Sequence, residues 1–182
     1  MGLQMLLYLF ALEREGPSRY GRETAPAGVL YVPARDVLVS APANLSDAEL
    51  ERERSKALRR SGLLLDEPDI LRAMEHGETP RYLPVSVKNG VYGGDCLAGA
   101  ERLGRLSRHI DATLRSMASE LRRGSIAADP YFRSSTDTAC QLCDYRAACH
   151  FDEETDCRRY LTKLSPGEVW EKIEKEARDG GL

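Results

Sequence analysis

Three cysteines near the C-terminal end constrain this chain more than any other feature. Cys140, Cys143 and Cys149 form a C-x2-C-x5-C pattern. Two cysteines separated by two residues can turn their sulfur atoms toward one point, and a third can return to it after a short helical turn. Thiolates gathered in this way hold zinc or an iron–sulfur cluster. Because clustered free thiols are prone to oxidation, we expect metal binding here.

The pattern lacks a fourth ligand, which zinc sites and iron–sulfur clusters usually have. His150 is adjacent to Cys149 in the chain, where the ligand geometry would be strained. Cys157 has a better reach, but its charged surroundings favour a surface thiol. Spacing alone therefore leaves open both the fourth ligand and the choice between zinc and an iron–sulfur cluster. Cys96 follows a predicted hairpin and is expected to be a small core residue.

The composition is that of a soluble globular protein. The chain has 182 residues, 42% of them hydrophobic and 30% charged, with a net charge of -3. Such a balance gives no global basic field, so any contact with DNA needs a local patch or a larger assembly. The five cysteines are an odd number and no basic leader precedes the first apolar run, which favours the reducing cytoplasm. That run is too short to span a bilayer, so we expect no membrane association.

Residues 2–14 are apolar on nearly every side, which predicts a helix buried on most faces and ended by Gly16-Pro17. A buried helix at the start of a chain suggests the C-terminal part of a longer protein. Gln4 and Tyr8, four residues apart, share one face of this helix. Buried there, both would need hydrogen-bond partners, and the local backbone is the simplest source.

The remaining elements follow from local signals. A Ser46–Glu49 capping box begins a charged helix that we expect Gly62 to end, and Arg59 and Arg60 are expected on the wet surface. Asn89-Gly90 predicts a type I′ hairpin turn. The predicted strands are 28–32, 37–39 and the two arms of a hairpin over 83–92; the other predicted helices are 68–75, 98–123 and 165–178. An irregular stretch is expected from Asp129-Pro130 to the cysteines.

Two of these features together resemble a known family. Leu3-Gln4-Met-Leu-Leu-Tyr8 resembles the Q-x-x-x-Y helix of RecB-type nucleases of the PD-(D/E)xK superfamily. The three cysteines followed by Phe151-Asp152 resemble the iron–sulfur staple of AddB-type subunits of bacterial helicase–nucleases. The resemblance covers residues 2–152. Cas4-like exonucleases share both motifs but usually have a much shorter span between them.

The resemblance implies an α/β (α+β) fold: part of a restriction-endonuclease-like core, with a mixed sheet flanked by helices, a Cys-rich loop and a tail helix. The predicted segments are 1–135 for the nuclease core, 136–160 for the cysteine cluster and 161–182 for the tail. The implied function is Mg²⁺-dependent hydrolysis of DNA by a double-strand-break repair enzyme, with an AddA-like helicase–nuclease subunit as partner. Gln4 and Tyr8 would support the active site or contact DNA. Cys140, Cys143 and Cys149 would hold a [4Fe-4S] cluster.

The chain also departs from the family. There, the metal-binding acid, the D/E-x-K strand and the first cluster cysteine all precede the Q-x-x-x-Y helix, and only Met1 to Leu3 precede Gln4 here. No residue of this chain can be assigned those roles, so we expect no Mg²⁺ site in it and a labile cluster or none. We also expect residues 132–160 to be poorly ordered without metal. The alternative is a non-enzymatic cysteine module that uses zinc or an iron–sulfur cluster to bind a protein or DNA.

We predict that the purified chain has no Mg²⁺-dependent nuclease activity, because it lacks assignable catalytic acids and lysine. The measurement is the release of acid-soluble nucleotides from linear duplex DNA. Activity that disappears when an internal carboxylate such as Asp66 is replaced would contradict this prediction.

Overall fold

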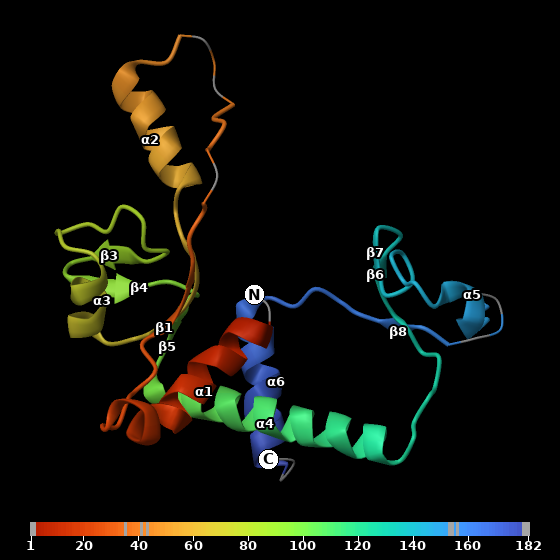
Figure 1. The fold of residues 1–182 in the computed structure, drawn as a ribbon. Helices are drawn as coiled ribbons and strands as arrows, with labels where there is room; N and C mark the ends of the chain where they lie inside the picture. Colours follow the sequence, from red (N-terminus) through yellow and green to blue (C-terminus); the bar gives the residue numbers. More distant parts are fainter. Residues whose placement is uncertain are drawn as a thin grey trace. The chain divides into compact units, whose positions relative to one another are not determined.

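The computed structural model describes residues 3–34, 36–40, 42, 44–152, 155 and 157–179. The chain divides into two compact units, Met1–Ile110 and Asp111–Gly181, and the boundary falls within one long helix. Each unit is described by itself. Both combine helices with short strands (Figure 1), in agreement with the predicted mixture of α and β structure.

The first unit contains a mixed sheet in the order β1-β2-β5, formed by Gly28–Tyr31, Ser61–Leu65 and Leu97–Ala98. β1 and β2 are antiparallel, and β2 and β5 are parallel. The predicted strand at 37–39 is wrong: these residues join no sheet, and Leu38 is 97% exposed. Its apolar sequence matches a strand, but a strand also needs a neighbour to satisfy its backbone.

A separate hairpin joins β3, Ser86–Lys88, to β4, Val91–Gly93. Asn89 and Gly90 have φ of 51° and 77°, which confirms the predicted type I′ turn. The best-buried core cluster lies beside it. Leu64 of β2, Leu71 of α3 (Pro68–Met74) and the pair Leu83 and Val85 are almost fully excluded from solvent. Each such side chain contributes roughly 1.5–3 kcal/mol by leaving water. Tyr92, Leu97 and Cys96 pack against them, which confirms Cys96 as a core residue.

The charged helix α2, Asp47–Ala57, begins with the predicted capping box, because Ser46 and Glu49 bond reciprocally. Gly62, however, does not end it. Gly62 lies within β2 at φ 156°, where an added Cβ would lie 1.9 Å from the carbonyl oxygen of Val29. The glycine is therefore needed for the close approach of β2 to β1 and not for a helix end.

Helix α1 runs over Leu3–Tyr20 and continues through Gly16-Pro17, contrary to the prediction. Pro17 cannot donate to the carbonyl of Glu13. The hydroxyl of Thr24 lies 3.4 Å from that carbonyl oxygen and 3.2 Å from the carbonyl oxygen of Leu12, so it replaces the lost donor. The helix is also buried on one face only, through Leu6 and Phe10, and contacts β1.

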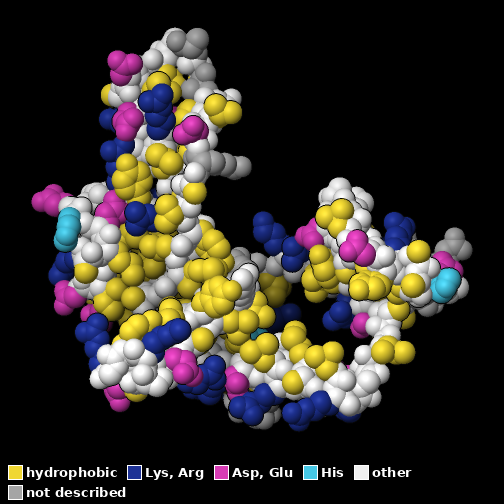
Figure 2. Space-filling view, viewed as in Figure 1, with side chains coloured by type: hydrophobic (Ala, Val, Ile, Leu, Met, Phe, Trp, Pro, Cys, Tyr) yellow, Lys and Arg dark blue, Asp and Glu magenta, His cyan; other side chains and the backbone are white. Residues whose placement is uncertain are grey.

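The prediction that α1 is buried on most sides is therefore wrong, since Leu3 and Leu12 are 42% and 45% exposed. The same holds for α4, Ala100–Arg122, whose apolar stripe is buried at Leu103, Leu106 and Ile110 and open at Leu114, Met117 and Leu121. Figure 2 shows hydrophobic side chains at the surface of both units. Periodicity identified both helices, but it does not indicate how much of a stripe is covered.

Three arginine and glutamate side chains hold the segment 81–85 in place. The guanidinium of Arg59 donates to the carbonyl oxygen of Leu83 at 3.0 Å and to that of Val85, so its predicted surface role is wrong. The carboxylate of Glu75 accepts backbone N–H bonds from Arg81, Tyr82 and Leu83 at 2.8–3.1 Å. Isolated charge was the expectation from sequence, and backbone anchoring is the outcome.

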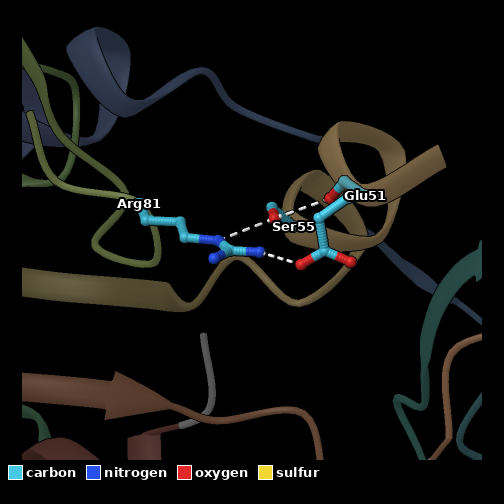
Figure 3. A network of polar contacts seen from close by, with 3 residues as sticks. All are labelled: Glu51, Ser55 and Arg81. Atoms are coloured by element: carbon cyan, nitrogen blue, oxygen red, sulfur yellow. Dashed lines mark hydrogen bonds and ion pairs between the residues drawn. The ribbon is translucent and has the colours of Figure 1, made fainter. Parts of the chain in front are cut away.

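Arg81 extends this anchoring to α2 (Figure 3). Its Nε donates to the hydroxyl of Ser55 at 2.8 Å, and its second guanidinium nitrogen pairs with Glu51. Both partners lie one turn apart on α2. The solvated helix is thereby tied to the segment that also completes the core.

The second unit contains a small sheet in the order β7-β6-β8, formed by Asp137–Thr138, Tyr131–Ser134 and Arg159–Tyr160. β6 is antiparallel to β7 and parallel to β8. The stretch after Asp129-Pro130 was predicted to be irregular, and the hairpin corrects that prediction. Strands this short and polar carry no alternation that sequence analysis can detect.

Two helices flank this small sheet in the chain. α5, Arg146–Cys149, lies between the cysteines, and α6, Pro166–Arg178, follows the predicted capping box of Ser165 and Glu168. Gly124 ends α4 at φ 68°, with the two reverse-turn hydrogen bonds of a Schellman motif. These local predictions are confirmed.

We predict that Glu75→Gln lowers the free energy of unfolding by about 1–2 kcal/mol at pH 7, because bonds from N–H donors to a carboxylate are stronger than those to an amide. Burial raises the pKa of Glu75, but three backbone donors and Arg60 together lower it below its usual value. A carboxyl with a depressed folded-state pKa stabilises the fold above its unfolded pKa, and that contribution disappears as pH falls through the folded value.

The difference between Glu75→Gln and the parent should therefore shrink below about pH 4, as measured by urea unfolding from pH 7 to pH 3. Glu78→Gln is the control, because Glu78 is exposed. A pH-independent difference, or an equal effect at Glu78, would contradict the assigned role.

Candidate functional site

Gln4 and Tyr8 lie on α1 and form a pair. The amide Nε2 of Gln4 donates to the phenol oxygen of Tyr8 at 2.7 Å. Both side chains are exposed, and Tyr8 is 52% accessible, so the expected burial and the expected backbone partners are both corrected. Because the two side chains satisfy one another, α1 presents a fixed polar pair on an open face.

The cysteine loop is closed at its base by the β6–β8 pairing. The backbone N–H of Leu161 donates to the carbonyl of Phe132 at 2.9 Å, and that of Arg159 donates to Pro130 at 3.0 Å. The rings of Phe132 and Tyr160 meet edge to face with centroids 5.6 Å apart. The chain on both sides of the cysteines is therefore held together before any metal is considered.

The cysteines occupy different positions in this loop. Cys140 directly follows β7 and is half-buried, with its N–H donating to the hydroxyl of Thr138 at 3.2 Å. Cys143 is exposed, and its carbonyl accepts from Arg146 at the start of α5. Cys149 is exposed at the end of α5, before His150 turns into the left-handed region at φ 53°. The predicted short helical turn between the second and third thiols is present.

The donor set of the loop does not form a metal centre by itself. Within the residues that the structure describes, no three His, Cys, Asp or Glu side chains are grouped to hold a metal ion, and all five cysteines are free thiols. The arrangement therefore does not fit a closed thiolate site. Thiol chemistry suits iron–sulfur ligation, but the geometry of this loop alone does not provide it.

The other candidate ligands are not brought to the cluster as a ligand group either. Cys157 and His150 are both exposed. Cys96 belongs to the other unit, where its thiol contacts the carbonyl of Pro84 at 3.1 Å. Burial raises the pKa of Cys96, which favours the neutral thiol over a metal-binding thiolate.

Sequence analysis missed the side chains that surround the loop. The guanidinium of Arg158 lies 4.7 Å from the ring centroid of Phe132, in cation–π geometry. With Arg146 and Cys140, these two residues line a hollow of about 380 Å³. The aromatic residues on either side of the cysteine pattern were the available signal, because paired strands would bring them together.

The internal carboxylates considered as possible catalytic acids have ordinary surroundings. Asp69 pairs with Arg72 at 3.0 Å, and Asp66 is exposed. Glu67 precedes α3 as its N-cap residue without a side-chain capping bond. Their surface role agrees with the expectation for these residues.

Comparison with known proteins bears on the two motifs. Residues 1–150 match the sequence profile of the PD-(D/E)XK nuclease superfamily. The chain belongs to this superfamily. The match includes the Gln4–Tyr8 pair and all three clustered cysteines, and the mixed sheet of the first unit is consistent with the fold.

Relatives are similar along almost the whole chain. A protein of Thermoanaerobacter sp. (strain X514) is 30% identical over 185 residues, which cover 98% of this chain and 16% of the relative. One of Desulforudis audaxviator is 33% identical and covers 93% of this chain. One of Symbiobacterium thermophilum is 30% identical and covers 99%. All three are named as the second subunit of an ATP-dependent helicase/deoxyribonuclease, and this chain spans 15–16% of their length.

No helix within the described part of the chain has the length and apolar character required to cross a membrane.

Proposed function

We propose that this chain is part of the nuclease domain of a helicase/deoxyribonuclease subunit that hydrolyses DNA phosphodiesters in double-strand-break repair. The observation that carries the proposal is similarity over nearly the full chain to proteins named as such subunits. The superfamily match over residues 1–150 supports the same reaction class. An AddA-like helicase–nuclease subunit is the proposed protein partner, and DNA is the substrate.

Mg²⁺ is the proposed catalytic metal, held by carboxylates of the longer protein. Such an ion activates the attacking water and stabilises the leaving oxygen. In this chain, Gln4 and Tyr8 have the supporting role. Their mutual hydrogen bond of 2.7 Å fixes the amide and the phenol before DNA arrives, so little side-chain entropy is lost on contact.

The proposed role of Cys140, Cys143 and Cys149 is to ligate a [4Fe-4S] cluster whose fourth ligand comes from elsewhere in the longer protein. Two observations support this division. The loop contributes thiols on both sides of α5, and the β6–β8 pairing closes it independently of metal. A cluster would then join this loop to a distant part of the protein, in the manner of a staple.

Replacement of Cys143 by Ser tests the cluster. In the longer protein, purified without oxygen, we expect about four iron atoms per chain in the parent and few in Cys143→Ser, because a serine hydroxyl is a poor substitute for a thiolate. The measurements are iron and sulfide content and visible absorption. Cys157→Ser is the matched control and should leave the iron content unchanged.

Equal iron loss in Cys143→Ser and Cys157→Ser would contradict the ligand assignment. Stoichiometric zinc in a colourless protein would instead favour the non-enzymatic zinc module.

Tyr8→Phe tests the supporting role of the polar pair. Loss of one hydrogen bond of about 1 kcal/mol should reduce DNA cleavage by the longer protein several-fold. The melting temperature should hardly change, because the pair is exposed. Tyr20→Phe, at the end of the same helix and 53% exposed, is the control for a phenol without this pairing. Cleavage by Tyr8→Phe equal to that by Tyr20→Phe would contradict the role.

A further inference from the structure

The hollow beside the cysteine loop has the size of a small-ligand pocket, at about 380 Å³. It lies wholly within the second unit. Figure 2 shows hydrophobic and Lys or Arg side chains close together on the part of the surface that carries this loop. Besides Cys140, the lining residues are Phe132, Ser135, Thr138, Gln141, Arg146 and Arg158.

The charge of this lining favours an anion. Arg146 and Arg158 contribute two guanidinium groups, and the residues that line the hollow include no carboxylate. Two nearby acids are already paired with other cations: Asp137 with Arg133 at 2.7 Å, and Asp129 with Arg159 at 3.2 Å. A guanidinium matches the oxygens of a phosphate in a bidentate manner, so a phosphate group suits this lining.

Neutral donors complete such a site. The hydroxyl of Thr138 accepts the backbone N–H of Cys140 at 3.2 Å, which leaves its own hydrogen for an acceptor in the hollow. Ser135 and Gln141 add a second hydroxyl and an amide. These groups can donate to phosphate oxygens that the two arginines do not reach.

The apolar wall distinguishes a nucleotide from a free anion. The ring of Phe132 is held by Tyr160 on its edge and carries Arg158 above its face, at 5.6 Å and 4.7 Å between the respective centres. Arg158 is thereby positioned before any ligand binds, which reduces the entropic cost of binding. Guanidinium groups next to an aromatic ring are the combination that binds a single strand of nucleic acid through its phosphates and bases.

We propose that Arg146 and Arg158 bind a phosphate of a DNA strand in this hollow, with the adjoining nucleotide against Phe132. The DNA source rests on the proposed function, whereas the phosphate chemistry rests on the lining alone. With a net charge of -3, the chain needs a local patch of this kind to contact DNA.

Arg146→Gln tests the site in the 182-residue chain. Fluorescence anisotropy with an end-labelled single-stranded oligodeoxynucleotide should show binding weakened about tenfold. The slope of log K against log salt concentration should fall by about one, as expected for one lost phosphate contact. Arg122→Gln, at the exposed end of α4 and outside the hollow, removes the same charge and should weaken binding less than twofold.

Ser135→Asp is a second variant that keeps both arginines and places a carboxylate in the lining. It should weaken oligodeoxynucleotide binding as strongly as Arg146→Gln, whereas Ser135→Ala should have little effect. Ser135 lies in the exposed turn between β6 and β7, so circular dichroism should confirm an unchanged fold.

The outcomes separate this site from the proposed function. Equal weakening by Arg146→Gln and Arg122→Gln overturns the site and leaves DNA binding in place. Binding of dTMP and inorganic phosphate that depends on Arg146, without binding of the oligodeoxynucleotide, supports the phosphate site and overturns DNA as its source. No binding of any of these probes at millimolar concentration overturns the site.

Discussion

The parallel pairing of β6 with β8 is the interaction on which the second unit depends. The backbone bonds from Arg159 and Leu161 to Pro130 and Phe132 close a loop that contains every clustered cysteine. The entropic cost of closing such a loop falls on the sheet and not on a metal. The same pairing brings Tyr160 and Arg158 to Phe132, so the thiols and the hollow beside them are two results of one short register.

The elements predicted correctly from sequence are those whose cause is local. Ser46 with Glu49, and Asn89 with Gly90, determine a helix start and a turn through neighbours only a few residues away. Gly62 was assigned to a helix end because its role depends on Val29, far away in the chain. Pro17 was expected to stop α1, and the compensating hydroxyl of Thr24 lies beyond the helix where no periodic pattern reports it.

The candidate site divides in the same way. The spacing of Gln4 and Tyr8 predicted a shared helix face, and the structure adds that they bond to one another in the open. The spacing of the cysteines identified a ligand loop and family resemblance gave it a function, which the superfamily match supports at the level of a nuclease. Arg146, Arg158 and Phe132 could not be grouped from sequence, because their grouping requires the pairing of strands that carry no hydrophobic alternation.

The excursion between β1 and β2 has a practical consequence. Tyr31 is paired directly with Ser61, so residues 32–60 leave the sheet and return to it at one place. The contacts of Arg81 with Glu51 and Ser55 lie near the C-terminal half of α2, which leaves the segment before Ser46 outside that junction. Doubling the length of such a segment costs only about 0.6 kcal/mol in closure entropy. An affinity tag or a fluorescent domain inserted there would report on the first unit without disturbing the register of its sheet.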